Sequence, residues 1–310
     1  MELYGHDAPD TRFELHLKTL NDKFENCSFP IFADTVKNGG VVKALNAKGA
    51  GKVFSRKTLD ELTSFVVNLG AKGLAYIKIN EDSIQSPLVK SLGEDLTNDI
   101  IKTMGGSAGD IIFFGAGDTS LVNLTMSKLR LKLGQMLELI NPKEYNLVWV
   151  LDFPLLEWSP EEKRYVAVHH PFTAPMDEDL ELLKTDPKSA RAKAYDLVLN
   201  GSEIGGGSVR IHRSDIQQEM FELMGFKDEE LQEKFGYFVE ALKYGTPPHG
   251  GIAFGIDRIA SIFAGADSIR DVIAFPKTQK ATDLMSSAPD FVDNKQLREL
   301  HIRTEKLLNK

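Results

Sequence analysis

The stretch AYDLVLNGSEIGGGSVR at residues 194–210 decides the fold class of this chain. Asn200-Gly201 lies between two apolar runs, and this dipeptide is a strong hairpin signal because a type I′ turn needs positive φ at both central residues. Such a turn pairs Val198 with Glu203 across two antiparallel strands. The sequence therefore predicts an α+β fold in which an antiparallel sheet, flanked by helices, carries the functional residues.

Two acidic side chains share one face of this predicted hairpin. Asp196 lies on the face of Val198 because side chains alternate along a strand, and it becomes a diagonal neighbour of Glu203. Two carboxylates that close repel each other, and a hard divalent cation such as Mg²⁺, shared with phosphate oxygens, would relieve that repulsion. The alternative is a pair of solvated carboxylates on an open sheet face, and the pairing alone does not decide between them.

Three consecutive glycines favour the metal interpretation. Gly205, Gly206 and Gly207 remove side chains from the interior of a strand, which weakens the strand unless a ligand or another backbone must come close. Arg210 follows them, and its rigid guanidinium fork can bind a carboxylate through two hydrogen bonds. The hairpin therefore predicts a site for a nucleotide-bound Mg²⁺ and for a ligand that carries a carboxylate.

A second candidate region is YGTPPHGGIAFGIDR at residues 244–258. It predicts a loop and a short strand that lead into a helix beginning near Asp257. Backbone amides at a helix start, with Arg258 in the first turn, suit a polyphosphate. A plain junction between loop and helix is the simpler interpretation, and the residue types alone favour it.

Two further motifs carry weaker signals. His169 and His170 are expected on a strand, where neighbouring side chains point to opposite faces, so they make poor ligands for one metal ion. The Gly115-Ala-Gly117 pattern follows a run typical of a strand, but Ser120 stands where a dinucleotide-binding fingerprint has its third glycine. We interpret that pattern as a turn.

The remaining pattern predicts an α+β module before residue 145 and further strands and helices after it. Its expected elements are strands at 29–36, 41–49 and 73–80, helices at 51–70 and 86–104, and a strand, glycine turn and helix from residue 110 to 137. Ser55 and Thr58 are candidate N-caps of the helix at 51–70. Later helices are expected at 215–225 and 227–245.

Composition limits the class of protein. The 310 residues are typical of two domains, and Lys+Arg 37 against Asp+Glu 45 gives a net charge of −8, so a nucleic acid would need a local basic patch. The single cysteine, Cys27, excludes an internal disulfide, which favours a reducing compartment such as the cytoplasm. No run approaches the ~18 apolar residues that cross a bilayer, so we expect no membrane partner.

Several motifs together resemble one enzyme family over almost the whole chain. They are LDFPLLEW, VHHPFTAP, NGSEIGGGSVRIH, EKFGYFVEALKYGTPPHGGIAFGIDR and RDVIAFPKTQKATDLMSSAP. They resemble the second half of the catalytic core of bacterial-type aspartyl-tRNA synthetases, which are class II aminoacyl-tRNA ligases. GIAFGIDR resembles motif 3 of that class, and YGHDAPDTRF resembles the connector that follows motif 2.

The resemblance implies a domain organisation. Residues 1–21 would be the connector from the catalytic core, residues 22–128 an inserted α+β domain shared with the GatB family of amidotransferase subunits, and residues 129–310 the C-terminal half of the core with motif 3. The class II core is an antiparallel sheet with flanking helices, and this chain would contain part of it. An amidotransferase subunit would share only the insertion and lack the motifs of residues 129–310.

The resemblance also assigns roles to individual residues. Aspartate would contact His169 and Arg210, with Arg210 pairing its side-chain carboxylate. Mg²⁺ on the ATP phosphates would be bound by Asp196 and Glu203. The ATP contacts would be Glu203, Gly255, Ile256, Asp257 and Arg258.

The implied activity is ATP-dependent activation of L-aspartate to aspartyl-adenylate and transfer to tRNA-Asp, with tRNA-Asn left open, in a parent enzyme that is a homodimer. The family's anticodon-binding domain, motif 1 and motif 2 have no counterpart in these residues. We therefore expect a fragment that is inactive alone. The alternative is a non-catalytic protein, derived from a synthetase, that binds tRNA or a partner, but the intact pair Asp196 and Glu203 with Arg210 and Arg258 favours the ligase.

Overall fold

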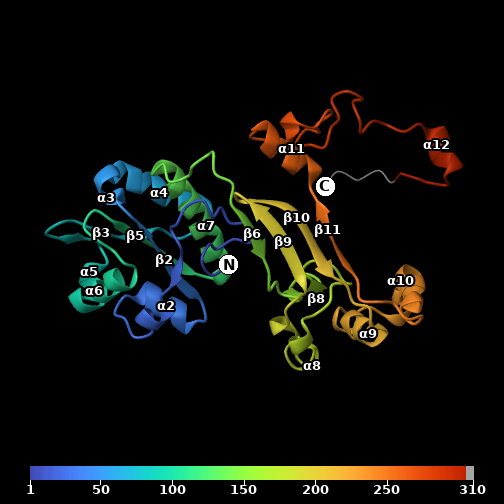
Figure 1. Cartoon of the computed structure of the whole chain (residues 1–310), viewed down its shortest axis with the longest axis horizontal. Helices are drawn as coiled ribbons and strands as arrows, with labels where there is room; N and C mark the ends of the chain where they lie inside the picture. Colours follow the sequence, from blue (N-terminus) through green and yellow to red (C-terminus); the bar gives the residue numbers. More distant parts are fainter. Residues whose placement is uncertain (305–310) are drawn as a thin grey trace. The chain divides into compact units, whose positions relative to one another are not determined.

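The computed structural model describes residues 1–304, and the chain divides into two compact units, Met1–Ala253 and Phe254–Lys310 (Figure 1). The first unit contains two sheets and a separate hairpin. The second unit is a short strand end, helices and loops. The domain boundaries expected from the resemblance, at 21/22 and 128/129, stay a prediction.

The first sheet has five strands in the order β1-β2-β5-β3-β4, and every neighbouring pair is antiparallel. Its strands are β1 (Lys18–Thr19), β2 (Val41–Ala47), β3 (Ala75–Ile79), β4 (Ile84–Gln85) and β5 (Ile111–Gly117). The strands predicted at 41–49 and 73–80 are confirmed as β2 and β3. The strand predicted after residue 110 is confirmed as β5.

Helices cover both faces of this sheet, so its central strands are buried on both sides. They are α1 (Asn21–Phe24), α2 (Pro30–Lys37), α3 (Ala50–Val53), α4 (Arg56–Asn68), α5 (Val89–Leu92), α6 (Glu94–Thr103) and α7 (Thr119–Met136). Along β5, Phe113 packs into one hydrophobic cluster with α4 and α7, whereas Phe114 packs into another with α2. This alternation follows from the two-residue period of a strand.

The prediction of a strand at 29–36 was wrong, because this segment is helix α2. Pro30 is its first residue, where the missing N–H of proline costs no hydrogen bond. Phe29, Phe32 and Val36 pack into the same cluster at helical spacing. A short apolar run fits a strand as well as a helix, and only the packing against β2 and β5 decides between them.

The other helices of the module agree with the sequence more closely. Ser55 is the N-cap of α4, and its side chain accepts a hydrogen bond from the Thr58 amide, which confirms the capping prediction. The single helix expected at 86–104 is instead two helices, α5 and α6, because Gly93 between them has a φ of 79°. The Gly115-Ala-Gly117 pattern ends β5, and Asp118 caps α7.

The second sheet has four strands in the order β11-β10-β9-β6. They are β6 (Leu147–Val150), β9 (Ala194–Leu199), β10 (Ser202–Val209) and β11 (Gly250–Phe254). The predicted hairpin is confirmed: Glu203 pairs with Val198, and the turn residues Asn200 and Gly201 have φ values of 52° and 84°. A register shift between Glu203 and Gly205 then pairs Asp196 with Gly206.

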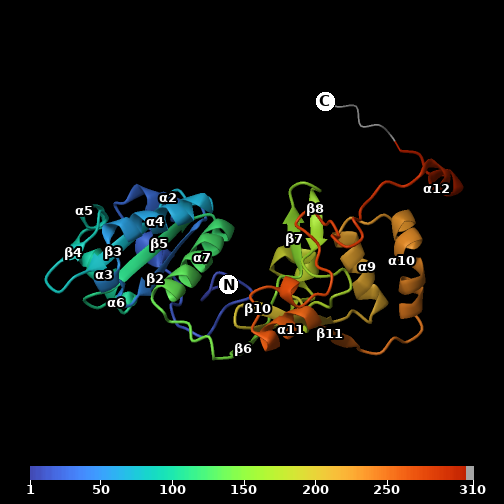
Figure 2. The same cartoon turned by 90° about the horizontal axis from the view of Figure 1, so that it is seen from above.

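A third cluster packs beside this sheet. It contains the hairpin of β7 (Leu156–Ser159) and β8 (Arg164–Ala167), the short helices α8 (Leu182–Thr185), η1 (Asp177–Asp179) and η2 (Pro187–Ser189), and helices α9 (Ser214–Leu223) and α10 (Asp228–Leu242). Helices α9 and α10 lie side by side (Figure 2). Met220 and Phe221 are almost completely buried there. The helices predicted at 215–225 and 227–245 are thereby confirmed.

The second unit begins at the end of β11. Its helices are α11 (Ile256–Ala264), η3 (Ile269–Asp271) and α12 (Asn294–Glu299). The helix predicted to begin near Asp257 is confirmed, one residue earlier. None of the helices in residues 1–304 combines the length and apolarity that crossing a bilayer requires.

Candidate functional site

The two carboxylates predicted to share a face do converge. A Cβ placed on Gly206 would overlap Asp196 Oδ1 and would lie 3.4 Å from Glu203 Oε1. Both carboxylates therefore lie over the bare backbone of Gly206, directly across β9 and β10. Any other residue at position 206 would push the two side chains apart, which is a physical reason for glycine here.

The environment of Asp196 disfavours its charged form. Burial raises the pKa of this carboxyl, and the negative charges of Glu203 and Asp7 raise it further, while His169 acts in the opposite direction. A carboxylate pair that is partly buried and mutually repulsive is costly to stability. Such an arrangement is typical of a site that a cation completes.

Asp7 is a residue that the sequence analysis missed. It lies in the turn-rich segment before the first strand, far from Asp196 in the sequence, and its charge nevertheless acts on Asp196. No periodic pattern in residues 1–17 indicated which side chains would face the hairpin. The acidic character of the segment was the one available signal.

Asp196 and Glu203 can supply some, but not all, of the ligands of a divalent cation. Hard cations bind carboxylate oxygens, and Asp196 and Glu203 supply those. Within residues 1–304, no group of three or more His, Cys, Asp or Glu residues is arranged to hold a metal ion. The remaining ligands would have to come from water and from a phosphate-bearing substrate, which is the usual way proteins bind Mg²⁺.

The next glycine has a different role. A Cβ on Gly207 would overlap the backbone oxygen of Gly251 in β11, so this glycine allows the two strands to approach. The Tyr195 hydroxyl donates a hydrogen bond of 3.1 Å to the same Gly251 oxygen. The missing side chain at Gly206 therefore leaves space for the Asp196 and Glu203 carboxylates, and the missing side chain at Gly207 allows β11 to approach β10.

Arg210 follows β10 and is fixed through its backbone. Its amide donates to the His249 carbonyl at 2.8 Å, and the residue forms an isolated bridge with Thr173. Its Nη1 is buried and has no hydrogen-bond acceptor among the described residues. A buried guanidinium nitrogen without an acceptor is costly, so this atom is suited to bind an anionic ligand.

His169 lies in a bend after β8, which ends at Ala167, and His170 follows it outside any strand, so the prediction that the two histidines sit on a strand was wrong. His169 packs edge-on against Phe153, with ring centroids 4.5 Å apart. His170 accepts a hydrogen bond from the Phe172 amide, and burial together with the positive charge of Arg210 lowers its pKa. The charge of His169 thus acts on Asp196, and the charge of Arg210 acts on His170, neither of which the sequence indicated.

The motif at the start of α11 belongs to the second unit. Gly255 is its N-cap residue, in an extended conformation, and no side chain caps the first amides of the helix. Asp257 and Arg258 are exposed in its first turn, and Ile256 is 71% exposed. The local arrangement is the one predicted for a phosphate-binding helix start.

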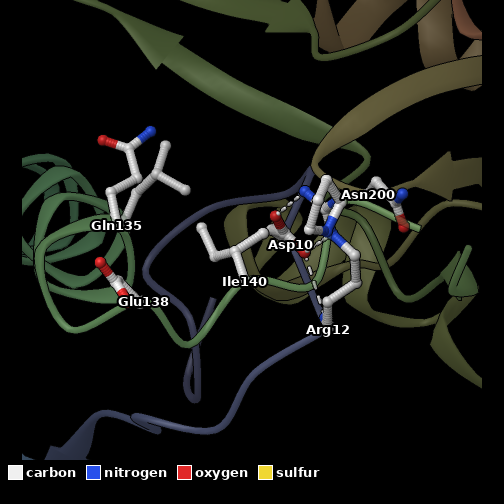
Figure 3. Close-up of a pocket in the computed structure, with 9 residues that line it drawn as sticks. Asp10, Arg12, Gln135, Glu138, Ile140 and Asn200 are labelled. Atoms are coloured by element: carbon white, nitrogen blue, oxygen red, sulfur yellow. Dashed lines mark hydrogen bonds and ion pairs between the residues drawn. The ribbon is translucent and has the colours of Figure 1, made fainter. Parts of the chain in front are cut away.

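A further cavity lies elsewhere in the first unit, and none of the predicted site residues lines it. Its volume is about 500 Å³, and Figure 3 shows Asp10 and Arg12 paired on one side of it beside Asn200. Glu138 and Ile140, at and beyond the end of α7, lie across from them. A smaller cavity of about 80 Å³ is lined in part by Arg210 and Lys193.

Comparisons with known proteins agree with the motifs. The chain is 58% identical over 304 residues to an aspartate–tRNA(Asp/Asn) ligase of Syntrophotalea carbinolica, which covers 98% of this chain and 51% of that protein. It is 54% identical over 301 residues to the ligase of the same name from Geotalea uraniireducens, over 97% of this chain and 51% of that protein.

An aspartate–tRNA ligase of Lysinibacillus sphaericus is 51% identical over 302 residues, again 97% of this chain and 51% of that protein. The chain thus spans about half the length of the curated relatives it matches. The family model of the class II tRNA synthetases for D, K and N matches residues 1–279. On the strength of that match, the chain belongs to the class II tRNA synthetases of the D, K and N group.

Proposed function

We propose that this chain carries the aspartate-binding part and the ATP-phosphate-binding part of an aspartate–tRNA ligase. The observation that carries the proposal is the convergence of Asp196 and Glu203 over Gly206, with the unsatisfied Nη1 of Arg210 farther along the same chain segment. Two acidic side chains and one arginine with a buried nitrogen that has no acceptor among the described residues suit a substrate pair, which is a polyphosphate with its metal and an amino acid with a carboxylate side chain.

Arg210 is the proposed ligand of the aspartate side chain. The Arg210 backbone is hydrogen-bonded to His249 and forms a bridge with Thr173, so the point from which its side chain extends is fixed. A carboxylate can accept two hydrogen bonds from the guanidinium. His169 is the proposed second aspartate contact, and its charge acts on Asp196. Asparagine offers an amide in place of the second oxygen, so it would lose one charge-assisted hydrogen bond.

Asp196 and Glu203 are the proposed ligands of Mg²⁺ on the ATP phosphates. The ion would supply charge neutralisation to the phosphates, and the bare backbone at Gly206 leaves space above the two carboxylates. Glu203 would also contact ATP. Gly255, Ile256, Asp257 and Arg258 are the proposed nucleotide contacts at the start of α11, where uncapped amides and an exposed guanidinium suit phosphate oxygens.

The reaction that these groups support is adenylation of aspartate. An oxygen of the aspartate α-carboxylate forms a bond to the α-phosphorus of ATP, the bond from that phosphorus to the bridging oxygen breaks, and pyrophosphate leaves. In the second step, a hydroxyl oxygen of the terminal ribose of tRNA loses its proton and forms an ester bond to the acyl carbon, the bond from that carbon to the phosphate oxygen breaks, and AMP leaves. Such a reaction requires no side-chain nucleophile, because positioning and neutralisation of charge lower the barrier.

The proposed partners are L-aspartate, ATP and tRNA-Asp. The names of two relatives cite both tRNA-Asp and tRNA-Asn, so tRNA-Asn is a second proposed substrate. We also propose that the parent enzyme is a cytoplasmic homodimer, as the family resemblance implies.

A non-hydrolysable aspartyl-adenylate analogue, aspartyl-sulfamoyl adenosine, tests the proposal by calorimetric titration of the 310-residue chain. We expect Arg210→Lys to weaken binding of the analogue roughly tenfold or more, because the ammonium of lysine cannot donate the two parallel hydrogen bonds of a guanidinium. Arg213→Lys is the matched control, since Arg213 is 56% exposed and pairs with Asp215.

Two results would contradict the proposal. The first is an asparaginyl analogue that binds as tightly as the aspartyl analogue, which would remove the assigned role of Arg210. The second is the absence of analogue binding at millimolar concentration together with binding of tRNA, which would favour a non-catalytic tRNA-binding protein.

A further inference from the structure

Helix α9 contains one polar side chain that is completely buried. Gln217 is 0% exposed, and the other buried residues of this helix, Met220 and Phe221, belong to a hydrophobic cluster. Its Oε1 has no hydrogen-bond partner among the described residues. A buried amide with an unmet acceptor is costly, and an apolar side chain of the same length would avoid that cost. Packing alone therefore does not explain a glutamine at this position.

The amide nitrogen of Gln217 has a specific partner. Nε2 donates a hydrogen bond of 3.0 Å to the Pro171 carbonyl, 46 residues earlier in the chain. A carbonyl oxygen can only accept, so the nitrogen of the side-chain amide must face it. Proline has no N–H, so this carbonyl is the only hydrogen-bonding group of the Pro171 backbone. Gln217 thus binds the one backbone group by which Pro171 can be fixed.

The chain that follows this proline pairs with the end of β10. The Phe172 carbonyl accepts a hydrogen bond of 2.9 Å from the Ile211 amide, and the Ala174 amide donates one of 2.9 Å to the Val209 carbonyl. Arg210 lies between these two hydrogen bonds. The position of its backbone therefore depends on the pairing of residues 172–174 with β10.

Side chains hold the same pairing together. Thr173 Oγ1 and Ser208 Oγ are 3.3 Å apart, and both side chains are buried. The ring of Phe172 stacks on that of Phe238 in α10, with ring centroids 4.2 Å apart. The aromatic contact fixes the Phe172 side chain, whereas Gln217 fixes the carbonyl just before it. Helices α9 and α10, which lie side by side in Figure 2, thus bind adjacent residues of one segment.

Only a short stretch of chain separates Arg210 from Gln217. Six residues lie between them, and a single residue separates Pro171 from Thr173, which forms a bridge with Arg210. The chain therefore closes on itself twice, once through the Gln217 side chain and once through the bridge at Thr173. His169 precedes Pro171 by two residues. Both side chains proposed to contact aspartate thus extend from backbone next to these closures.

We propose that Gln217 is a positioning residue that, by binding the Pro171 carbonyl, holds the segment paired with Arg210 and so fixes the direction of the guanidinium. The inference rests on the proposed function of Arg210 as the ligand of the aspartate side chain. Two parallel hydrogen bonds to a carboxylate require a narrow range of guanidinium orientations, whereas a single hydrogen bond tolerates a wider range. Gln217 is buried, so it favours aspartate over asparagine without contact with either ligand.

Calorimetric titration with aspartyl-sulfamoyl adenosine and with its asparaginyl counterpart tests the proposal. We expect Gln217→Met to weaken binding of the aspartyl analogue to the 310-residue chain about fivefold, because a displaced guanidinium keeps only one well-aligned hydrogen bond. Binding of the asparaginyl analogue should change less than about twofold, since its amide offers a single acceptor to the guanidinium.

The matched control is Gln218→Met. Gln218 is the next residue of α9, and its Nε2 donates to Glu222 Oε1 at 3.1 Å on the surface of the same helix. This substitution removes the same chemical group from the same helix without affecting the Pro171 carbonyl. The control should leave the affinities for both analogues unchanged.

The two analogues separate positioning from a general loss of structure. A destabilised fold would weaken both analogues by the same factor, so the ratio of the two affinities would stay constant. An equal loss for both analogues would therefore overturn the proposal, as would an aspartyl affinity of Gln217→Met equal to that of the unchanged chain. An unchanged chain without a preference for the aspartyl analogue contradicts instead the proposed role of Arg210, on which this inference rests.

A double-mutant cycle tests whether the effect passes through Arg210. In the Arg210→Lys background, Gln217→Met should weaken the aspartyl analogue by less than about twofold more, because no guanidinium remains to be oriented. If Gln217→Met has its full effect in that background, the effect does not pass through Arg210, and the proposal is wrong.

Hydrogen exchange gives a readout that needs no ligand. We expect Gln217→Met to speed exchange of the Ala174 and Ile211 amides, which pair the segment with β10, while the amides of α10 keep their protection. Unchanged exchange at these two amides would rule the proposal out. If Gln217→Met does not fold, Gln217→Asn keeps an amide but is one methylene too short to reach Pro171. It should give the same faster exchange and the same selective loss of aspartyl-analogue binding.

Discussion

Asp196 combines partial burial with the negative charge of Glu203, and this combination lowers the free energy of unfolding by an amount that can be measured. Its pKa is raised by burial first and by Glu203 next. The folded protein therefore binds the Asp196 proton more tightly than the unfolded chain does. Below the ordinary pKa of 3.8, both states are protonated and the group contributes nothing. As the pH rises through this value, the folded state is progressively disfavoured.

Asp196→Asn should therefore stabilise the chain at neutral pH. The amide removes the like-charge repulsion with Glu203 while it keeps the shape of the side chain. We expect a rise in Tm of about 2 °C at pH 7, which disappears near pH 3.5. Differential scanning calorimetry at the two pH values measures it.

The control for that experiment is Glu161→Gln, an exposed acidic residue in the β7–β8 turn. It should leave Tm unchanged at both pH values. A lower Tm for Asp196→Asn at pH 7 would mean that the carboxylate stabilises the fold, and the repulsion described here would be wrong.

The hairpin of β9 and β10 is the element on which the acidic pair depends. The register shift after Glu203 pairs Asp196 with Gly206 in place of Gly205. A bulge of this kind bends a strand and redirects its side chains. It brings the Glu203 carboxylate over the same glycine as Asp196, so one irregularity in one strand creates the pair.

Strand β10 also contains a glycine, Gly207, at which an added methyl group should destabilise the sheet. Gly207→Ala places a Cβ against the Gly251 oxygen of β11, and we expect a loss of roughly 1–3 kcal/mol in the free energy of unfolding. Gly251→Ala is the matched control, because a Cβ there meets no atom within 4 Å.

Urea unfolding measures both glycine variants, with the fluorescence of Trp149 in β6 and Trp158 in β7 as the readout. Equal stabilities of the two variants would show that β10 and β11 do not approach as closely as the structure has them.

The whole chain belongs to a ligase family and spans about half the length of the relatives it matches. Its first unit contains the acidic pair and Arg210, and its second unit contains the start of α11. The proposed function divides the substrate contacts between these two local arrangements. Catalysis requires all reacting groups to be oriented at once, which is a stricter condition than binding.

We expect the 310-residue chain to show no aspartate-dependent exchange of labelled pyrophosphate into ATP. The reason is that motif 2 of the class, which the family resemblance leads us to expect in a complete catalytic core, has no counterpart in these residues. Arg210→Ala is the control. Exchange that is present in the unchanged chain and abolished by this substitution would show that the residues present suffice for adenylation.

Local patterns were sufficient for the hairpin at residues 194–210, for the N-cap at Ser55 and for the helix start at Ile256. In each case, the signal and the structure lie within a few residues of each other, so backbone preferences decide the outcome. The roles of Arg210 and Arg258 remain proposals, which the buried Arg210 Nη1 without an acceptor among the described residues and the uncapped start of α11 support.

The tertiary structure decided the remaining features. Residues 30–37 became helix α2 because their apolar face packs on the sheet, and a short apolar run does not specify its own period. Residues 13–15 lie against α7 because Arg130, more than a hundred residues away in the sequence, donates hydrogen bonds to their carbonyl groups. The sequence by itself determined turns and caps, whereas contacts between distant segments determined which charges meet, because the energy of a contact depends on distance in space.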